Sequence, residues 1–185
     1  MKKPGTVNIS DIEMSERIDE GILCKYCISK RDFNILFEFI KMANKEGYPF
    51  KSVISPEQKV YFLIDSMRRD YIGFLVWRKD QLDKNHIVME GLDFDSYKHK
   101  CCGEILQLIY IVPEERRKGI GSKFIKYWVE NVADNTYDLF GVELMGGSFI
   151  LNVLLKLGYI NEKDPEKSHC YLVETGRKAV PKYIK

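Results

Sequence analysis

The chain has 185 residues, of which 45% are hydrophobic and 30% charged, and its net charge is +2. This is the composition of an ordinary globular protein, and the length suits one domain with a real hydrophobic core. The balanced charge argues against a basic nucleic-acid-binding face, and no apolar run is long enough to cross a bilayer. We therefore expect a cytoplasmic protein with no nucleic-acid or membrane partner.

The N-terminal residues predict an extension followed by a strand. Residues 1–20 are polar with scattered acids and lack the apolar stretch of a signal peptide. We expect them to form a mobile or loosely docked N-terminal extension, ahead of a single domain over residues 21–185. The apolar run at 22–28 is short and favours a first strand.

A helix is predicted next. Ser29 followed by Asp32 resembles the capping box with which many helices begin. Four apolar residues then fall at helical spacing, namely Phe33, Leu36, Phe37 and Ile40. Gly47 is a suitable stop, and Pro49 and Pro56 bracket a loop or a short second helix.

The middle of the chain predicts a hairpin and a long connection. Residues 60–64 and 71–77 are strand candidates separated by the polar turn 65–70, as in an antiparallel hairpin. Residues 79–102 form a highly charged connection. It is longer than usual for a compact domain, so we expect some structure or a function there.

The C-terminal part alternates between strand-like and helix-like spacing of its apolar residues. It predicts a strand over 104–112, a helix over 119–132, a strand over 137–145, a helix from Ser148 to Leu157 and a short strand over 170–173. Gly158 suits the left-handed end of the last helix. This order of elements predicts a mixed α/β domain around a central sheet.

Five cysteines are present, two of them in a C-x-x-C pair formed by Cys24 and Cys27. In a strand these two side chains point to opposite faces, which argues against a shared metal. A zinc site would need a second pair, which only folding could supply from His99, Cys101, Cys102, His169 and Cys170. We expect no metal and interpret the thiols as reduced and packed like small apolar side chains.

The stretch from Leu106 to Ser122 carries the chemistry. It runs from an apolar strand through a basic, glycine-containing turn into an amphipathic helix. Amides at a helix start are unpaired and favour negative charge, and glycines let a ligand approach them. The turn therefore indicates a phosphate site. It is neither a Walker loop nor a dinucleotide fingerprint, and a plain strand-to-helix turn with surface arginines is the alternative.

The sequence Arg116-Arg117-Lys118-Gly119-Ile120-Gly121 resembles the R/Q-x-x-G-x-G/A motif of the GNAT superfamily of N-acetyltransferases. The preceding strand, the Pro113-Glu114 turn and the segment ending in Leu157-Gly158-Tyr159 are also similar to that family. The resemblance covers about residues 104–160 and implies a mostly antiparallel sheet that is flanked by helices and splayed at the acetyl-CoA site.

The resemblance also implies the cofactor-binding residues. Acetyl-CoA would be the co-substrate, with its pyrophosphate on the loop residues Arg116, Arg117, Lys118, Gly119, Ile120, Gly121 and Ser122. The main chain of Ile109, Tyr110 and Ile111 would pair with the pantetheine arm like an added strand. Family members transfer the acetyl group directly to an amine without an acyl-enzyme.

Glu104 is the candidate general base, because many family members carry a carboxylate early in this strand. Counting back from Pro113, however, the family position corresponds to Ile105, and one residue of offset turns a strand side chain to the other face. A solvated carboxylate at the strand edge is the alternative for Glu104.

Two departures from the family concern the general acid. Leu154 stands where a tyrosine is frequent, and Gly147 where an asparagine is. Tyr159 or Tyr171 could supply the proton, although each is more often a packing residue.

The predicted function is an N-acetyltransferase acting on a primary amine of a small molecule or a protein. A GNAT-fold module that binds CoA or a protein partner without catalysis is the alternative. A homodimer is left open, and the sequence does not identify the acceptor.

Overall fold

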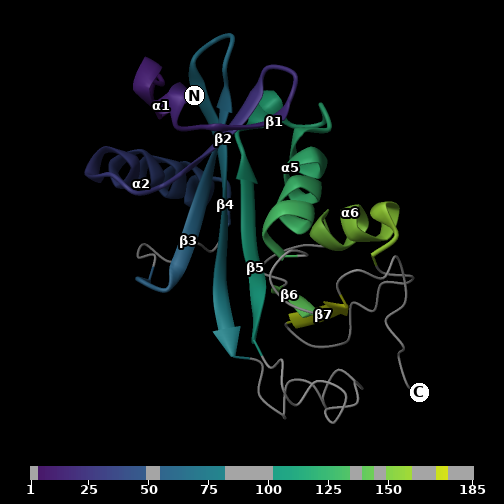
Figure 1. Cartoon of the computed structure of the whole chain (residues 1–185). Coiled ribbons are helices and arrows are strands. Elements are labelled where there is room, and N and C mark those ends of the chain that lie inside the picture. Colours follow the sequence, from purple (N-terminus) through teal and green to yellow (C-terminus); the bar gives the residue numbers. More distant parts are fainter. Residues whose placement is uncertain are drawn as a thin grey trace, which may run out of the picture. The chain divides into compact units, whose positions relative to one another are not determined.

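The computed structural model describes residues 4–48, 55–81, 102–133, 139–143, 149–159 and 170–174 (Figure 1). The chain forms two compact units. The first comprises residues 1–77 and 108–124, and the second comprises residues 78–107 and 125–185. Both units contain strands and helices, so the mixed α/β class is confirmed. None of the helices in the described part is long and apolar enough to cross a membrane.

The first unit is built on strands that neighbour one another in chain order: β1 (Glu16–Asp19), β2 (Ile22–Tyr26), β3 (Gln58–Asp65), β4 (Asp70–Gln81) and the end of β5 (Cys102–Ile111). Strand β2 pairs antiparallel with both β1 and β3. The β2–β3 register runs from Ile22 opposite Asp65 to Tyr26 opposite Tyr61. The predicted strands at 22–28, 60–64 and 71–77 are thus confirmed.

Helix α2 (Lys30–Lys45) begins at the predicted capping box. The Ser29 side chain accepts a hydrogen bond from the Asp32 amide at 3.1 Å, and the Asp32 carboxylate accepts one from the Ser29 amide at 2.9 Å. The predicted helical spacing holds, but Phe33 and Phe37 are 52% and 45% exposed. The other two predicted residues, Leu36 and Ile40, are buried, and the buried face also includes Ile35, Phe39, Met42 and Ala43.

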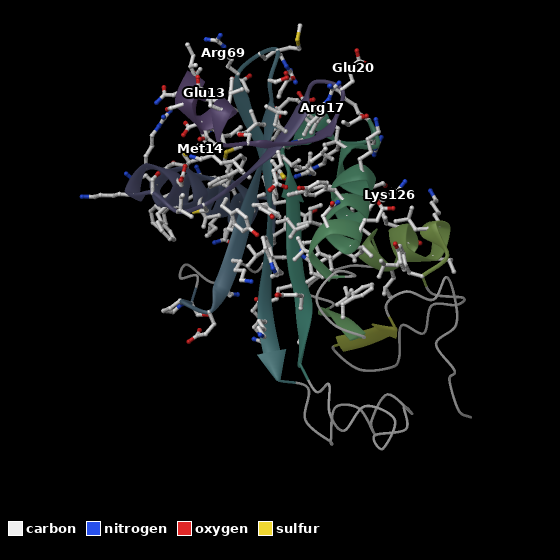
Figure 2. The ribbon with its side chains drawn as sticks, viewed as in Figure 1. Glu13, Met14, Arg17, Glu20, Arg69 and Lys126 are labelled. Atoms are coloured by element: carbon white, nitrogen blue, oxygen red, sulfur yellow. The ribbon has the colours of Figure 1, made fainter. Side chains whose placement is uncertain are left out.

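The N-terminal stretch is tied to the first unit. Helix α1 (Ile9–Glu13) and strand β1 lie within it, and β1 pairs with β2. The Lys25 ammonium, 4% exposed, lies 2.7 Å from a carboxylate oxygen of Asp11 and 2.7 Å from one of Asp32. The expectation of loose docking is therefore wrong for these elements. Met14, directly after α1, does face the solvent (Figure 2). The division into an extension and a single domain stays a prediction.

The second unit contains the start of β5, then β6 (Leu139–Glu143) and β7 (Cys170–Glu174). Strand β6 pairs in parallel with β5 and antiparallel with β7. In the parallel pair, Glu104 to Leu106 lie opposite Phe140 to Val142. Helix α6 (Phe149–Leu157) ends at Gly158, whose φ of +78° is the predicted left-handed stop. Residues 82–101 of the charged connection lie outside the described residues, as do 49–54 between the prolines.

Helix α5 (Ile120–Trp128) is shorter than the predicted helix, because a π-helical turn, η2 (Val129–Ala133), follows it. In the second unit, the fully buried Trp128 packs edge-on against Phe140, with ring centroids 5.8 Å apart. Burial of such a large side chain fixes this end of the helix.

Candidate functional site

All ten residues predicted to bind the cofactor lie in the 108–124 part of the first unit. Strand β5 ends at Ile111, and the next amide, of Val112, donates a hydrogen bond to Ile72 of β4 at 3.0 Å. A 3-10 turn, η1 (Pro113–Glu115), follows, and it begins with a proline as such turns often do. The Arg116 amide donates to the Pro113 carbonyl at 3.2 Å and closes the turn.

The backbone then passes twice through the left-handed region, at Arg117 with φ +63° and at Gly119 with φ +79°. The carbonyl of Gly119 accepts from the Lys123 amide at 3.1 Å, so α5 starts directly behind it. Arg116, just before Arg117, is extended with φ −69° and ψ 159°, whereas Gly119 is followed directly by the right-handed Ile120 of α5. A left-handed residue next to a right-handed one makes successive N–H groups converge on one point, a geometry that binds anions. The positive end of the α5 dipole adds to this potential.

The space in front of Gly119 is open. A Cβ built on this residue would meet no protein atom of the described structure within 4 Å. Arg117 adopts a conformation that costs a non-glycine residue about 1–2 kcal/mol, and such strain is concentrated at functional sites. Ile120 and Gly121 are buried and Ser122 is half-buried. The first turn of α5 is thus anchored on one side, while its entrance stays open at Gly119.

The basic side chains of the loop differ in what they contact. Arg116 is held by a carboxylate: its Nη2 atom lies 2.6 Å from Glu46 Oε2. Lys118 Nζ lies 3.0 Å from Glu115 Oε2. Glu115 is buried and also accepts from Arg68 at 2.7 Å. Of the three basic residues, only the exposed Arg117 has no acidic partner among the residues that the structure describes.

The end of β5 is tightly enclosed. Tyr110 is 1% exposed and its hydroxyl donates to Glu46 Oε1 at 2.6 Å. Burial raises the pKa of this hydroxyl, and the hydrogen bond to Glu46 raises it further. The Ile111 carbonyl accepts from Arg116 Nε at 2.8 Å. Of the three residues expected to pair with the pantetheine arm, Ile111 therefore has its carbonyl engaged within the protein, and Ile109 is half-buried.

Glu104 lies in the second unit, on β5 opposite Phe140 of β6. It is 3% exposed, and Ile105 is 4% exposed. The alternative interpretation of Glu104 as a solvated strand-edge carboxylate is therefore wrong. Neighbouring residues on a strand point to opposite faces, and here both are buried. The alternation of side chains along β5 therefore does not show which residue is exposed.

The other residues discussed for proton transfer are unequally placed. Leu154 is fully buried on α6, and the Tyr159 ring contacts Phe140 at 6.1 Å between centroids, as a packing residue does. Gly147 lies outside the described residues. Tyr171 is on β7, paired with Val142.

The C-x-x-C cysteines are unreactive in character. Cys24 is 1% exposed and Cys27 is half-buried. Burial raises the pKa of each thiol to about 12, so little thiolate forms at neutral pH. Among the described residues, no group of three His, Cys, Asp or Glu side chains is placed to hold a metal ion.

Comparison with known proteins identifies the fold. No family model and no curated protein matches the sequence. Among solved structures, Arabidopsis thaliana NAA60 in complex with acetyl-CoA matches with a TM-score of 0.56 and 13% identity, over 83% of this chain and 97% of that one. The chain has the GNAT acetyltransferase fold.

Two further structures of this GNAT fold match comparably. One is the NatC complex bound to Gag peptide and CoA, with a TM-score of 0.52 and 13% identity over 83% of this chain and 97% of that one. The other is AtaTR bound with AcCoA, with a TM-score of 0.50 and 10% identity over 85% of this chain and 95% of that one. All three crystal structures contain CoA or acetyl-CoA.

Glu46 was not found by sequence reasoning. It lies 70 residues before Arg116, its ion-pair partner, and at the C-terminal cap of α2. No motif spacing connects the two residues, so only the fold reveals the pair.

Proposed function

We propose that this protein binds acetyl-CoA and transfers the acetyl group directly to a primary amine of a small molecule or a protein. The observation that carries the proposal is the left-handed backbone at Arg117 and Gly119, at the start of α5 and within a GNAT fold. Converging amides at a helix N-terminus are suited to a pyrophosphate. The solved relatives of the same fold were crystallised with CoA or acetyl-CoA.

In this proposal the amides from Arg117 to Gly121 bind the pyrophosphate, with the exposed Arg117 side chain and the Ser122 hydroxyl close by in sequence. The Arg116 amide is already bonded to Pro113, so it is not among the amides that bind the pyrophosphate. The pantetheine arm follows the main chain of Ile109 and Tyr110, whose backbone groups are suited to hold it like an added strand.

The chemistry requires loss of a proton, stabilisation of an oxyanion and departure of a thiolate. A lysine-type amine with a pKa near ~10.4 is protonated at neutral pH, so a base must accept its proton. Glu104 is our candidate base. The neutral amine nitrogen attacks the thioester carbon and the C–S bond breaks. The second proton that the nitrogen loses as the amide forms passes to the departing CoA thiolate, which is released as the free thiol. A thiol with a pKa near ~8.5 leaves readily, so the leucine at position 154 does not preclude turnover.

A second function remains open on one observation. Leu154 is fully buried in α6, where a tyrosine would be expected for a general acid. A GNAT-fold protein lacking that acid could bind CoA or a protein partner without transferring an acetyl group.

The cytoplasmic location, like the absence of a nucleic-acid partner, stays a prediction from the sequence.

A thiol-release assay separates the two functions. Purified protein is incubated with acetyl-CoA and a panel of polyamines, aminoglycosides, lysine peptides and peptides with free N-termini. Release of free CoA above the rate of an amine-free control, with an acetylated product identified by mass spectrometry, supports the enzyme. Binding of acetyl-CoA without turnover of any amine class supports the non-catalytic module.

A further inference from the structure

A single carboxylate, that of Glu46, links helix α2 to the loop that starts α5. Glu46 Oε1 accepts from the Tyr110 hydroxyl at 2.6 Å, and Oε2 accepts from Arg116 Nη2 at 2.6 Å. The side chains of Arg116 and Glu46 are 34% and 19% exposed, so the pair is partly shielded from water. All of these residues belong to the first unit.

The Arg116 guanidinium is fixed from several directions. Its Nε atom donates to the Ile111 carbonyl at 2.8 Å, while Nη2 contacts Glu46. Its Cζ atom lies 5.3 Å from the centroid of the Tyr110 ring and 6.0 Å from that of Tyr48. A planar guanidinium held by hydrogen bonds and stacked on aromatic rings has few alternative positions.

This arrangement bears directly on the anion-binding backbone. Arg116 is the residue immediately before the left-handed Arg117, and its side chain reaches back to the end of β5. The side chain therefore sets the distance between the end of the strand and the first converging amide. Without Glu46, the Ile111 carbonyl and the ring contacts are what holds the guanidinium among the described residues, and the entry to the loop loosens.

We propose that Glu46 is a positioning residue for acetyl-CoA: by holding Arg116 against the end of β5, it pre-orders the Arg117–Gly121 amides for the pyrophosphate. The inference rests on the proposed function, because it assigns Glu46 to the same acetyl-CoA site. Pre-ordering improves affinity because the loop's ordering cost is met before the ligand arrives. Interaction energies between residues of one ion-pair network typically correspond to changes of about 2–150-fold.

Glu46 could also have the opposite effect on acetyl-CoA binding, and the experiment distinguishes the two. If Glu46 sequestered Arg116 away from the ligand, its removal would release a cation toward the phosphates and tighten binding. Positioning and sequestration thus predict changes of opposite sign for the same substitution.

The experiment measures acetyl-CoA binding to Glu46→Gln by calorimetry, with Glu38→Gln as the matched control. Glu38 lies on the same helix and pairs with Lys41 at 2.8 Å, but both side chains are about half exposed. We expect about tenfold weaker binding for Glu46→Gln and unchanged binding for Glu38→Gln. For any amine that is turned over, the KM for acetyl-CoA should rise while kcat at saturation is retained. A general loss of packing would not produce that split.

A double-mutant cycle with Arg116→Gln locates the effect. If Glu46 acts through Arg116, the double variant binds acetyl-CoA about as weakly as the weaker single variant. Tyr110→Phe, which keeps the ring and the ion pair, is the second variant if Glu46→Gln folds poorly, and it should weaken binding by a smaller factor. Unchanged or tighter binding in folded Glu46→Gln, or additive losses in the double variant, overturns the inference. Failure of the wild-type protein to bind acetyl-CoA would instead overturn the proposed function.

Discussion

Replacing Gly119 by alanine separates backbone strain from loss of the ligand site. Gly119 has φ +79°, and an added Cβ meets no described protein atom within 4 Å. The cost to the fold is therefore the left-handed conformation alone, about 1–2 kcal/mol. For a chain of this size that lowers Tm by about 2–8 °C.

The cost to binding should be much larger. In the bound protein the Cβ would project into the open space from which phosphate oxygens reach the amides. Loss of two charge-assisted hydrogen bonds at about 1.5 kcal/mol each amounts to about 3 kcal/mol, or about a hundredfold in Kd. Calorimetric titration with acetyl-CoA, together with a thermal melt of the unliganded protein, measures both quantities.

Gly158 provides the matched control. It has φ +78° at the end of α6, and its added Cβ likewise meets nothing within 4 Å of the described protein. Gly158→Ala should lower Tm by a similar amount and leave acetyl-CoA binding unchanged. If Gly119→Ala is folded and binds acetyl-CoA as tightly as the Gly158→Ala control, the phosphate site has been misplaced.

Three further predictions concern the base and the buried ion cluster. Glu104→Gln should lower kcat by about 10²–10⁴-fold and flatten the acidic limb of the pH–rate profile, and an unchanged profile would place the base elsewhere. Lys25→Met leaves two carboxylates without their shared cation, so it should lower the free energy of unfolding in urea by about 3–5 kcal/mol. The control Lys41→Met removes an exposed ion pair and should lower it by about 0–1 kcal/mol. Equal losses in the two variants would refute the cluster's role. Burial raises the pKa of Asp11 and Asp32, but hydrogen bonds from Lys25 and from backbone amides outweigh it, so both pKa values are lowered. The cluster's stabilisation should therefore be present above about pH 4 and decline as the pH falls below it, which unfolding curves at a series of pH values would show.

Local patterns predicted most of the elements. The capping box at Ser29 and Asp32, the left-handed stop at Gly158 and the strand ending before Pro113 each depend on residues within a few positions of one another. Such features are set by backbone geometry and are readable from a short window. The fold class followed from their order, and the solved GNAT structures support it.

The side-chain arrangement of the site could not be predicted in the same way. The Glu46–Arg116 pair joins residues 70 positions apart, and the Lys25 pair with Asp11 joins residues 14 apart. Periodicity also failed to show that Glu104 is buried, because burial there depends on what covers each face of β5. The roles of the loop residues and of Glu104 stay proposals.

Calorimetric titration of the wild-type protein with acetyl-CoA and with CoA tests the central claim most directly. A converging set of amides and a strand-like pantetheine contact act together, so we predict one site per chain with a Kd in the micromolar range or tighter. A thermal shift on adding acetyl-CoA should accompany binding, because a ligand that binds only the folded state stabilises it. No heat and no thermal shift at millimolar ligand would contradict the account.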